Sequence, residues 1–154
     1  MDIELTYKKA TENDIDYLFD LRTKTMVPHY EESNLPTDRE TTLQRILYEF
    51  DKAYIIFMDH HRVGLLKVNE TAEKTEVLQL QIGPEFQGRG LGGKILKNIL
   101  DDAAQKGKIV WLSVLKTNKA QHLYTSLGFK VVGEDEHSFL WKLKSVDLKV
   151  KTER

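Results

Sequence analysis

The sequence contains no cysteine, only three prolines and two tryptophans, and no long run of apolar residues. The lack of cysteine excludes disulfide bonds, thiolate–zinc sites and a cysteine nucleophile. No apolar segment could cross a bilayer and the start carries no apolar signal region, so we expect a cytoplasmic protein. No group of His, Asp and Glu residues has the spacing of a metal site.

The chain also has no excess of charge of either sign, because it contains 23 Lys and Arg residues and 24 Asp and Glu residues. Neither nucleic acid nor an anionic membrane is therefore expected as a partner. The 154 residues are enough for one domain with a core, which we place at residues 1–144. Residues 145–154 are expected to form a charged tail or an edge strand, and such a strand would allow a homodimer.

The most informative stretch reads VLQLQIGPEFQGRGLGGKILKNILDDAA, from Val77 to Ala104. Apolar and polar residues alternate up to Ile82, which predicts a strand that ends at Gly83. Beyond the glycine-rich loop, apolar residues recur at helical spacing, which predicts an amphipathic helix. A loop of this kind directs backbone N–H groups and the positive end of the helix dipole at one point, where a phosphate binds readily.

Two nucleotide motifs fit the loop only in part. Gly88–Gly93 satisfies G-x-G-x-x-G, but the following strand, Ile109–Leu115, does not end in the acidic residue that would hold a ribose. Gly88–Lys94 satisfies G-x-x-x-x-G-K, but Ile95 stands where a Ser or Thr would bind magnesium. A dinucleotide enzyme and a P-loop nucleotide enzyme are therefore disfavoured.

The third motif is complete: Gln87–Gly92 matches the Q/R-x-x-G-x-G/A pyrophosphate loop. Here the sequence resembles the GCN5-related N-acetyltransferases, the GNAT family, which transfers acetyl groups from acetyl-CoA to amines. The stretch Asn118–Phe129 resembles the family's N-x-x-A-x-x-x-Y-x-x-x-G-F pattern. The resemblance implies an α/β fold, with a mixed seven-stranded sheet covered by helices on both faces. A glycine-rich turn without a ligand is the alternative, although four glycines would then weaken a helix start without benefit.

The resemblance also implies which residues hold acetyl-CoA and the product coenzyme A. The backbone of Leu80 and Ile82 would bind the pantetheine arm like an added strand, and one N–H there would polarise the thioester carbonyl. The loop amides would hold the pyrophosphate, with Arg89 adding charge. The expected coenzyme-binding residues are Leu80, Gln81, Ile82, Gln87, Gly88, Arg89, Gly90, Leu91, Gly92, Gly93 and Asn118.

Catalysis needs a proton donor for the departing thiolate and a base for the ammonium ion. The resemblance assigns the first role to Tyr124, although a tyrosine on the apolar face of a short helix is also an ordinary core residue. Asn118 is equally well explained as a helix N-cap. Glu76 roughly matches the catalytic glutamate of the family's histone-modifying members, or is a solvated strand end. A coenzyme A-binding sensor without activity is the competing function.

The acceptor is expected to be a small-molecule or peptide amine. Tyr30 and Glu31 lie in the segment that closes over the acceptor site in this fold, where Glu31 would attract a cationic amine or be simply exposed. Gln79 and Gln81 share one face of the central strand, where apolar residues are usual, so we expect them to line a wet cleft and orient the substrate.

The rest of the chain predicts an ordinary alternation of elements. Leu5 and Tyr7 alternate with charged residues, which predicts a strand with one buried face. Thr11 is a candidate cap for a helix that runs to about Met26 and is stopped by Pro28, and Thr37 begins a capping box for a second helix. The further expected strands are Ala53–Met58, Val63–Asn69, Phe129–Val132 and Phe139–Leu143, and Gly107 and Gly128 are expected to end helices.

Overall fold

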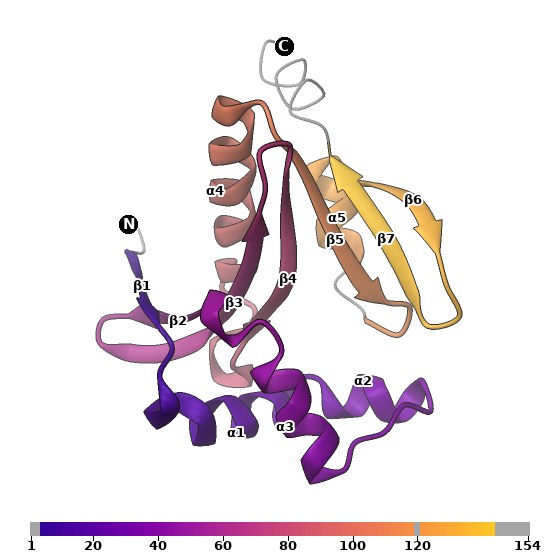
Figure 1. The fold of residues 1–154 in the computed structure, drawn as a ribbon. Coiled ribbons are helices and arrows are strands. Elements are labelled where there is room, and N and C mark those ends of the chain that lie inside the picture. Colours follow the sequence, from indigo (N-terminus) through magenta and orange to yellow (C-terminus); the bar gives the residue numbers. More distant parts are fainter. Residues whose placement is uncertain (1–3, 119–120, 144–154) are drawn as a thin grey trace. The chain divides into compact units, whose positions relative to one another are not determined.

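The computed structural model describes residues 4–118 and 121–143, so the expected tail at 145–154 and positions 119–120 of the second signature lie outside the described residues (Figure 1). The strands form one seven-stranded sheet in the order β1-β2-β3-β4-β5-β7-β6. Strands β4 and β5 pair in parallel, and the pairs β1–β2, β2–β3, β5–β7 and β6–β7 are antiparallel. The expected mixed seven-stranded fold is thus confirmed. The strands are β1 (Leu5–Lys9), β2 (Ala53–Met58), β3 (His61–Glu70), β4 (Lys74–Ile82), β5 (Ile109–Leu115), β6 (Lys130–Glu134) and β7 (Ser138–Leu143).

The chain divides into two compact units, which are described separately. The first contains the residues up to Val68 together with Gln79–Leu91, and the second contains Asn69–Leu78 and the residues from Gly92 onward. Strands β3 and β4 contribute to both, because each crosses a boundary between the units.

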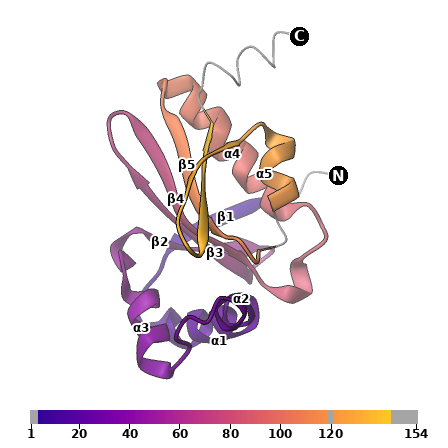
Figure 2. The same ribbon diagram turned by 90° about the vertical axis from the view of Figure 1, so that its right-hand side faces the viewer.

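In the first unit, three helices lie together (Figure 2): α1 (Ile15–Thr25), α2 (Val27–Glu32) and α3 (Arg39–Leu47). Helix α1 contacts both α2 and α3. The core contains Leu18 and Leu21 from α1 and Ile46 from α3. These residues pack with Ile55 and Leu65, whose strands carry them inward. Burial of such side chains is the main source of stability for this unit.

Two sequence-based expectations in this unit were wrong in detail. Strand β1 has no buried face, and Tyr7 is 39% exposed, because β1 is the edge strand of the sheet. The first helix ends as expected, since α1 stops at Thr25 with Met26 as its C-cap, and Pro28 lies in the first turn of the next helix, α2, where its missing N–H costs no hydrogen bond. The cap of α3 is Asp38 rather than Thr37, since the Asp38 carboxylate accepts from the Thr41 backbone N–H at 3.1 Å. Thr11 does cap a first turn, which is a 3₁₀ turn (Glu12–Asp14) ahead of α1.

The second unit contains α4 (Leu91–Lys106, all but its first residue) and α5 (Gln121–Leu127) with β5, β6 and β7. Helix α4 ends at Gly107, as expected, with φ of 68°, and the next N–H, of Lys108, donates to the Ala103 carbonyl at 2.8 Å. This is the Schellman arrangement. Gly128, with φ of 101°, likewise follows α5.

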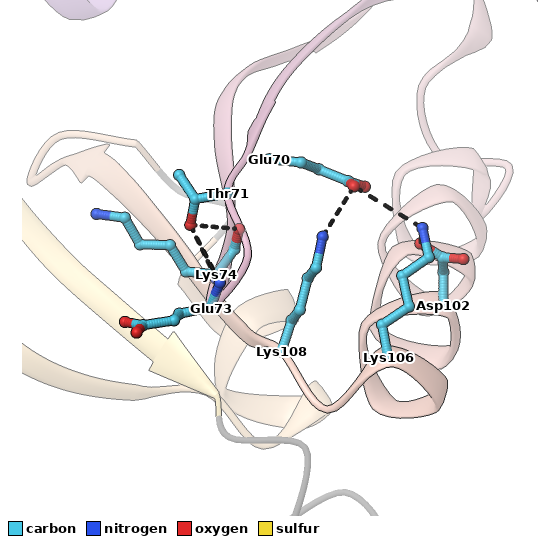
Figure 3. A network of polar contacts seen from close by, with 7 residues as sticks. All are labelled: Glu70, Thr71, Glu73, Lys74, Asp102, Lys106 and Lys108. Carbon is cyan, nitrogen blue, oxygen red and sulfur yellow. Dashed lines mark hydrogen bonds and ion pairs between the residues drawn. The ribbon is translucent and has the colours of Figure 1, made fainter.

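A polar network joins the β3–β4 turn to the end of α4 (Figure 3). The Glu70 carboxylate lies 3.1 Å from Lys108 Nζ and 3.8 Å from Lys106 Nζ, and Lys106 also pairs with Asp102 at 3.0 Å. Thr71 closes the turn, because its hydroxyl accepts from the Lys74 backbone N–H at 3.1 Å. Exposed pairs of this kind add little energy singly. Together they fix the turn that positions β4.

Candidate functional site

The end of β4 and the loop beyond it form a compact turn within the first unit. The Gly83 N–H donates to the Val63 carbonyl at 2.8 Å, and a 3₁₀ turn, Pro84–Phe86, follows at once. The Gln87 amide then donates back to the Ile82 carbonyl at 2.8 Å, which ties the loop to the end of the strand. The Gln87 side chain therefore shapes the loop. This role was not among the sequence-based expectations, which gave Gln87 only a backbone contact.

The loop glycines have the backbone that an anion site needs. Gly88 and Gly90 have φ of 78° and 77°, and a Cβ atom placed on either would meet nothing within 4 Å. Positive φ favours glycine, and the open space lets a ligand approach the backbone directly. Helix α4 starts immediately afterwards at Leu91, so the loop directly precedes a helix start, which is the kind of backbone position that favours an anion. The Arg89 guanidinium carbon lies 5.6 Å from the Phe86 ring centroid, on the exposed side of the loop.

Gly92 and Gly93, at the start of the second unit, have a different reason to be glycine. Neither has positive φ, and a Cβ atom on them would meet the Leu123 side chain at 3.8 and 3.4 Å. They allow α4 and α5 to pack closely. The sequence pattern groups all four glycines as phosphate-binding, whereas the structure gives the second pair a packing role as well.

Tyr124 lies in α5 among aromatic side chains of its own unit. Its ring meets Phe129 edge-on at 6.3 Å between centroids, and Trp141 at 5.7 Å. Burial raises the pKa of the Tyr124 hydroxyl, so the hydroxyl keeps its proton at neutral pH. These contacts fit both the proton donor and the core residue considered above. Asn118 stands two residues before position 120, one fewer than in the family pattern, which weakens its assignment to the coenzyme.

Glu76 lies on β4 opposite Trp111 of β5. Its carboxylate pairs with Lys74 Nζ at 3.2 Å and accepts from the Asn69 amide at 3.4 Å. Glu76 is the third residue of β4 rather than its end, and a base at this position would have to release the lysine. The role of Glu76 in catalysis stays a prediction.

Polar acceptors do gather on β4 within the first unit. The side-chain oxygens of Gln79 and Gln81 are both buried and have no hydrogen-bond partner among residues 4–118 and 121–143. Gln81 is only 5% exposed. A buried carbonyl oxygen without a donor costs free energy, so two of them on one strand face are typical of a site that a ligand completes.

Glu31 is exposed on α2, whereas Tyr30 is held firmly. The Tyr30 hydroxyl accepts from Arg22 Nη2 at 2.8 Å, and the Arg45 guanidinium carbon lies 3.9 Å from its ring centroid. Neither arginine was among the site residues expected from the sequence. Arg22 was detectable, because it occupies an apolar position of the helical pattern that includes Leu18.

The described part of the chain has neither a membrane-spanning helix nor a group of side chains that could hold a metal ion. No helix there is long and apolar enough to span a bilayer. No three His, Cys, Asp or Glu side chains come together among residues 4–118 and 121–143 in a way that would hold a metal ion.

A mixed sheet whose central strand leads through a glycine loop into a helix defines a class of proteins that hold a phosphorylated ligand at the helix start. Comparison with known families identifies the family within this class. Residues 15–129 match the model of the Acetyltransferase (GNAT) family, and the chain therefore belongs to that family.

Individual relatives cover the chain only in part. The spermidine N(1)-acetyltransferase of Escherichia coli K12 is 33% identical over 95 residues, which are 58% of this chain and 50% of that enzyme. The N-alpha-acetyltransferase RimI of Mycobacterium tuberculosis is 42% identical over 59 residues, 38% of this chain and 36% of that one. The chain thus spans about half or less of these relatives' lengths.

Solved structures extend the likeness of fold to almost the whole chain. The PaiA N-acetyltransferase of Thermoplasma acidophilum, solved in complex with coenzyme A, has a TM-score of 0.70. It covers 92% of this chain and 99% of its own at 20% sequence identity. At that identity the likeness concerns the fold alone.

Proposed function

We propose that this protein is an N-acetyltransferase that moves an acetyl group from acetyl-CoA to a primary amine by direct transfer in a ternary complex. The observation that carries the proposal is the loop of Gly88 and Gly90, with positive φ and open space on the side where a Cβ atom would lie. Membership of the GNAT family supports the same cofactor. The coenzyme A in the PaiA structure agrees with it.

Successive segments of this chain would bind successive parts of acetyl-CoA. The backbone of Leu80–Ile82 would bind the pantetheine arm, with Gln81 contributing its backbone. The amides of Gln87–Gly93 would hold the pyrophosphate, beside the Arg89 charge. Acetyl-CoA supplies the activated acetyl group as a thioester. Asn118 would contact the arm only if the one-residue shift from the family pattern is tolerated.

Proton transfers fall to side chains of the chain itself. Tyr124, protonated at neutral pH, would donate a proton to the leaving thiolate. Glu76 would accept the proton of the ammonium ion, and Glu31 with Tyr30 would face the amine. Gln79 and Gln81 would orient it, since their unpartnered side-chain oxygens are natural acceptors for N–H groups.

The relatives' names span different acceptors, spermidine in one case and an α-amine in another. For this chain we propose only an amine of a small molecule or peptide. A cytoplasmic location and a homodimer stay predictions, and so does the expectation that nucleic acid and membrane are not partners.

The test is release of coenzyme A thiol by the purified protein, with acetyl-CoA and a panel of amines. We expect release that depends on the amine and yields the acetylated amine by mass spectrometry. Binding of acetyl-CoA without release from any amine would instead identify a coenzyme A-binding sensor. Failure to bind acetyl-CoA would overturn both.

A further inference from the structure

Arg22 is buried without the partners that a guanidinium group needs. It is 3% exposed, and only Nη2 has a hydrogen bond, to the Tyr30 hydroxyl at 2.8 Å. Its Nε and Nη1 atoms are buried and have no partner among the residues that the structure describes. A buried cation with a single neutral acceptor is unfavourable, so this position is typical of a group that an additional ligand completes.

More positive charge lies beside it in the first unit. Arg45 places its guanidinium carbon 3.9 Å from the Tyr30 ring centroid, and Arg22 lies over the same ring at 5.5 Å. Lys67 is 0% exposed and donates to the Ile46 carbonyl at 2.8 Å. We call Arg22, Tyr30, Arg45 and Lys67 the cationic cluster.

No carboxylate forms an ion pair with the cationic cluster within the described part of the chain, although the pKa of the Asp38 carboxyl, lowered first by hydrogen bonds from Thr41, is also lowered by the Arg45 charge. Burial lowers the pKa of Arg22, and Arg45 lowers it further, while Tyr30 opposes the shift. The carboxylate that acts on Lys67 is that of Glu49, which forms its own ion pair with Lys52. Three cations are thus held together by hydrogen bonds to neutral groups and by one aromatic ring.

The outer members of the cluster reach the surface of the unit that carries the glycine loop. Tyr30 and Arg45 are half-buried, so they reach the surface of the first unit. Helix α1, which carries Arg22, is connected to the turn after β4 through β3: the Arg62 guanidinium carbon lies 5.5 Å from the Tyr17 ring centroid of α1, and the adjacent Val63 carbonyl accepts from the Gly83 N–H.

We propose that the cationic cluster binds an anionic group, a carboxylate or a phosphate, carried by the acceptor beside its amine. The planar donor fork of arginine matches both groups with paired hydrogen bonds. The inference rests on the proposed function and narrows its acceptor to zwitterionic amines, such as amino acids or phosphorylated amino alcohols. A polyamine carries only positive charge and would be repelled by the cluster.

Matched acceptors test the inference by thiol release. Alanine is compared with alaninamide, phosphoethanolamine with ethanolamine, and all four with spermidine. We expect kcat/KM to be at least about tenfold higher for one anionic acceptor than for its uncharged counterpart, as a charged hydrogen bond in a buried site provides. The pair of acceptors that shows this preference tells whether the cluster binds a carboxylate or a phosphate. Ratios near one in both pairs, or a preference for spermidine over both anionic acceptors, would overturn the proposal.

Variants show whether the cluster causes the preference. Arg22→Met keeps most of the side-chain volume and should reduce the ratio to near one, and Arg45→Met should reduce it in part. Arg39→Met is the matched control, because Arg39 also stacks on an aromatic ring, that of Phe19 at 4.8 Å, but lies outside the cluster. If Arg22→Met does not fold, Arg45→Met decides. A ratio unchanged in the folded variants would assign the preference elsewhere and overturn the proposal.

A binding measurement separates this inference from the proposed function. N-acetylalanine and N-acetylalaninamide are titrated calorimetrically into the protein saturated with coenzyme A. We expect the carboxylate to bind at least about tenfold more tightly and Arg22→Met or Arg45→Met to remove the difference. This result would support the anion site even if no amine were acetylated. Equal affinities would exclude the site even if acetyl transfer were found.

Discussion

At the scale of single residues, Tyr124 has a side chain whose environment fits a proton donor. Burial raises its pKa above 10, so the proton is present over the whole neutral range and is lost only in strongly alkaline solution. We expect Tyr124→Phe, which keeps the ring and its contacts with Phe129 and Trp141, to lower kcat by roughly 10²-fold. Steady-state kinetics with acetyl-CoA and an active amine measure this, and the melting temperature should change little.

Tyr7→Phe is the matched control for Tyr124→Phe. Burial also raises the pKa of Tyr7, but Tyr7 lies on the edge strand β1, away from the expected machinery. Its removal should leave kcat unchanged. If Tyr124→Phe lowers stability without a specific loss of kcat, Tyr124 is a core residue. If kcat is unchanged while chemistry limits the rate, the thiolate takes its proton from water.

The burial of Lys67 leads to a second prediction, which concerns how the free energy of unfolding depends on pH. Burial, together with the Arg22 charge and against the opposing effect of Glu49, lowers its pKa from 10.5 to about 8. The unfolded chain therefore holds this proton more tightly than the folded chain, so folding stability rises as pH increases from about 8 toward 10.5. We expect the free energy of unfolding of the wild type, relative to Lys67→Met, to rise by up to roughly 3 kcal/mol across this window.

Urea unfolding of both proteins at pH 7, 8, 9 and 10 measures this difference. Lys130→Met is the control, because Lys130 is exposed and its loss should give a difference that does not change across the window. A difference for Lys67→Met that is constant with pH would show that the carbonyls of Arg45, Ile46 and Tyr48, which accept from Lys67 Nζ, offset its burial.

At the scale of elements, the loop between β4 and α4 has its own test. Gly90→Val places a branched side chain at φ of 77° and on the side where a phosphate must approach. Acetyl-CoA affinity should fall by at least about 100-fold while the fold survives, since a Cβ atom there meets nothing within 4 Å. Isothermal titration measures the affinity, and circular dichroism reports the fold.

Gly107→Val is the control that separates backbone strain from ligand contact. Gly107 has φ of 68° and equally open surroundings, but it ends α4 instead of preceding it. Both variants should lose similar stability, and only Gly90→Val should lose the coenzyme. Equal affinities in the two variants would mean that the pyrophosphate is held elsewhere.

The sequence predicted elements well where the signal is local. The strand, the loop and α4 follow one another along the chain, and glycine spacing, helical periodicity and the Gly107 cap each lie within a few residues. The cationic cluster was missed because it is made by distant residues: Lys67 and Arg45, whose carbonyl accepts from Lys67 Nζ, are 22 positions apart. The edge position of β1 was missed for the same reason, since strand order depends on partners far along the chain.

At the scale of the whole molecule, binding of acetyl-CoA should stabilise the folded chain by mass action. At a concentration 100 times Kd, a ligand that binds only the folded state adds about 2.7 kcal/mol. For a chain of this size that corresponds to a rise in Tm of roughly 5–10 °C.

We expect this rise for acetyl-CoA and coenzyme A in a thermal unfolding scan, and a much smaller one for ATP with magnesium or for NAD. Those two ligands need the magnesium-binding hydroxyl and the ribose-binding carboxylate that the sequence lacks at Ile95 and after Leu115. Gly90→Val is the control, because its Tm should no longer respond to acetyl-CoA. A larger shift with ATP or NAD than with acetyl-CoA would assign the glycine loop to a nucleotide enzyme and overturn the assignment of the loop to the coenzyme.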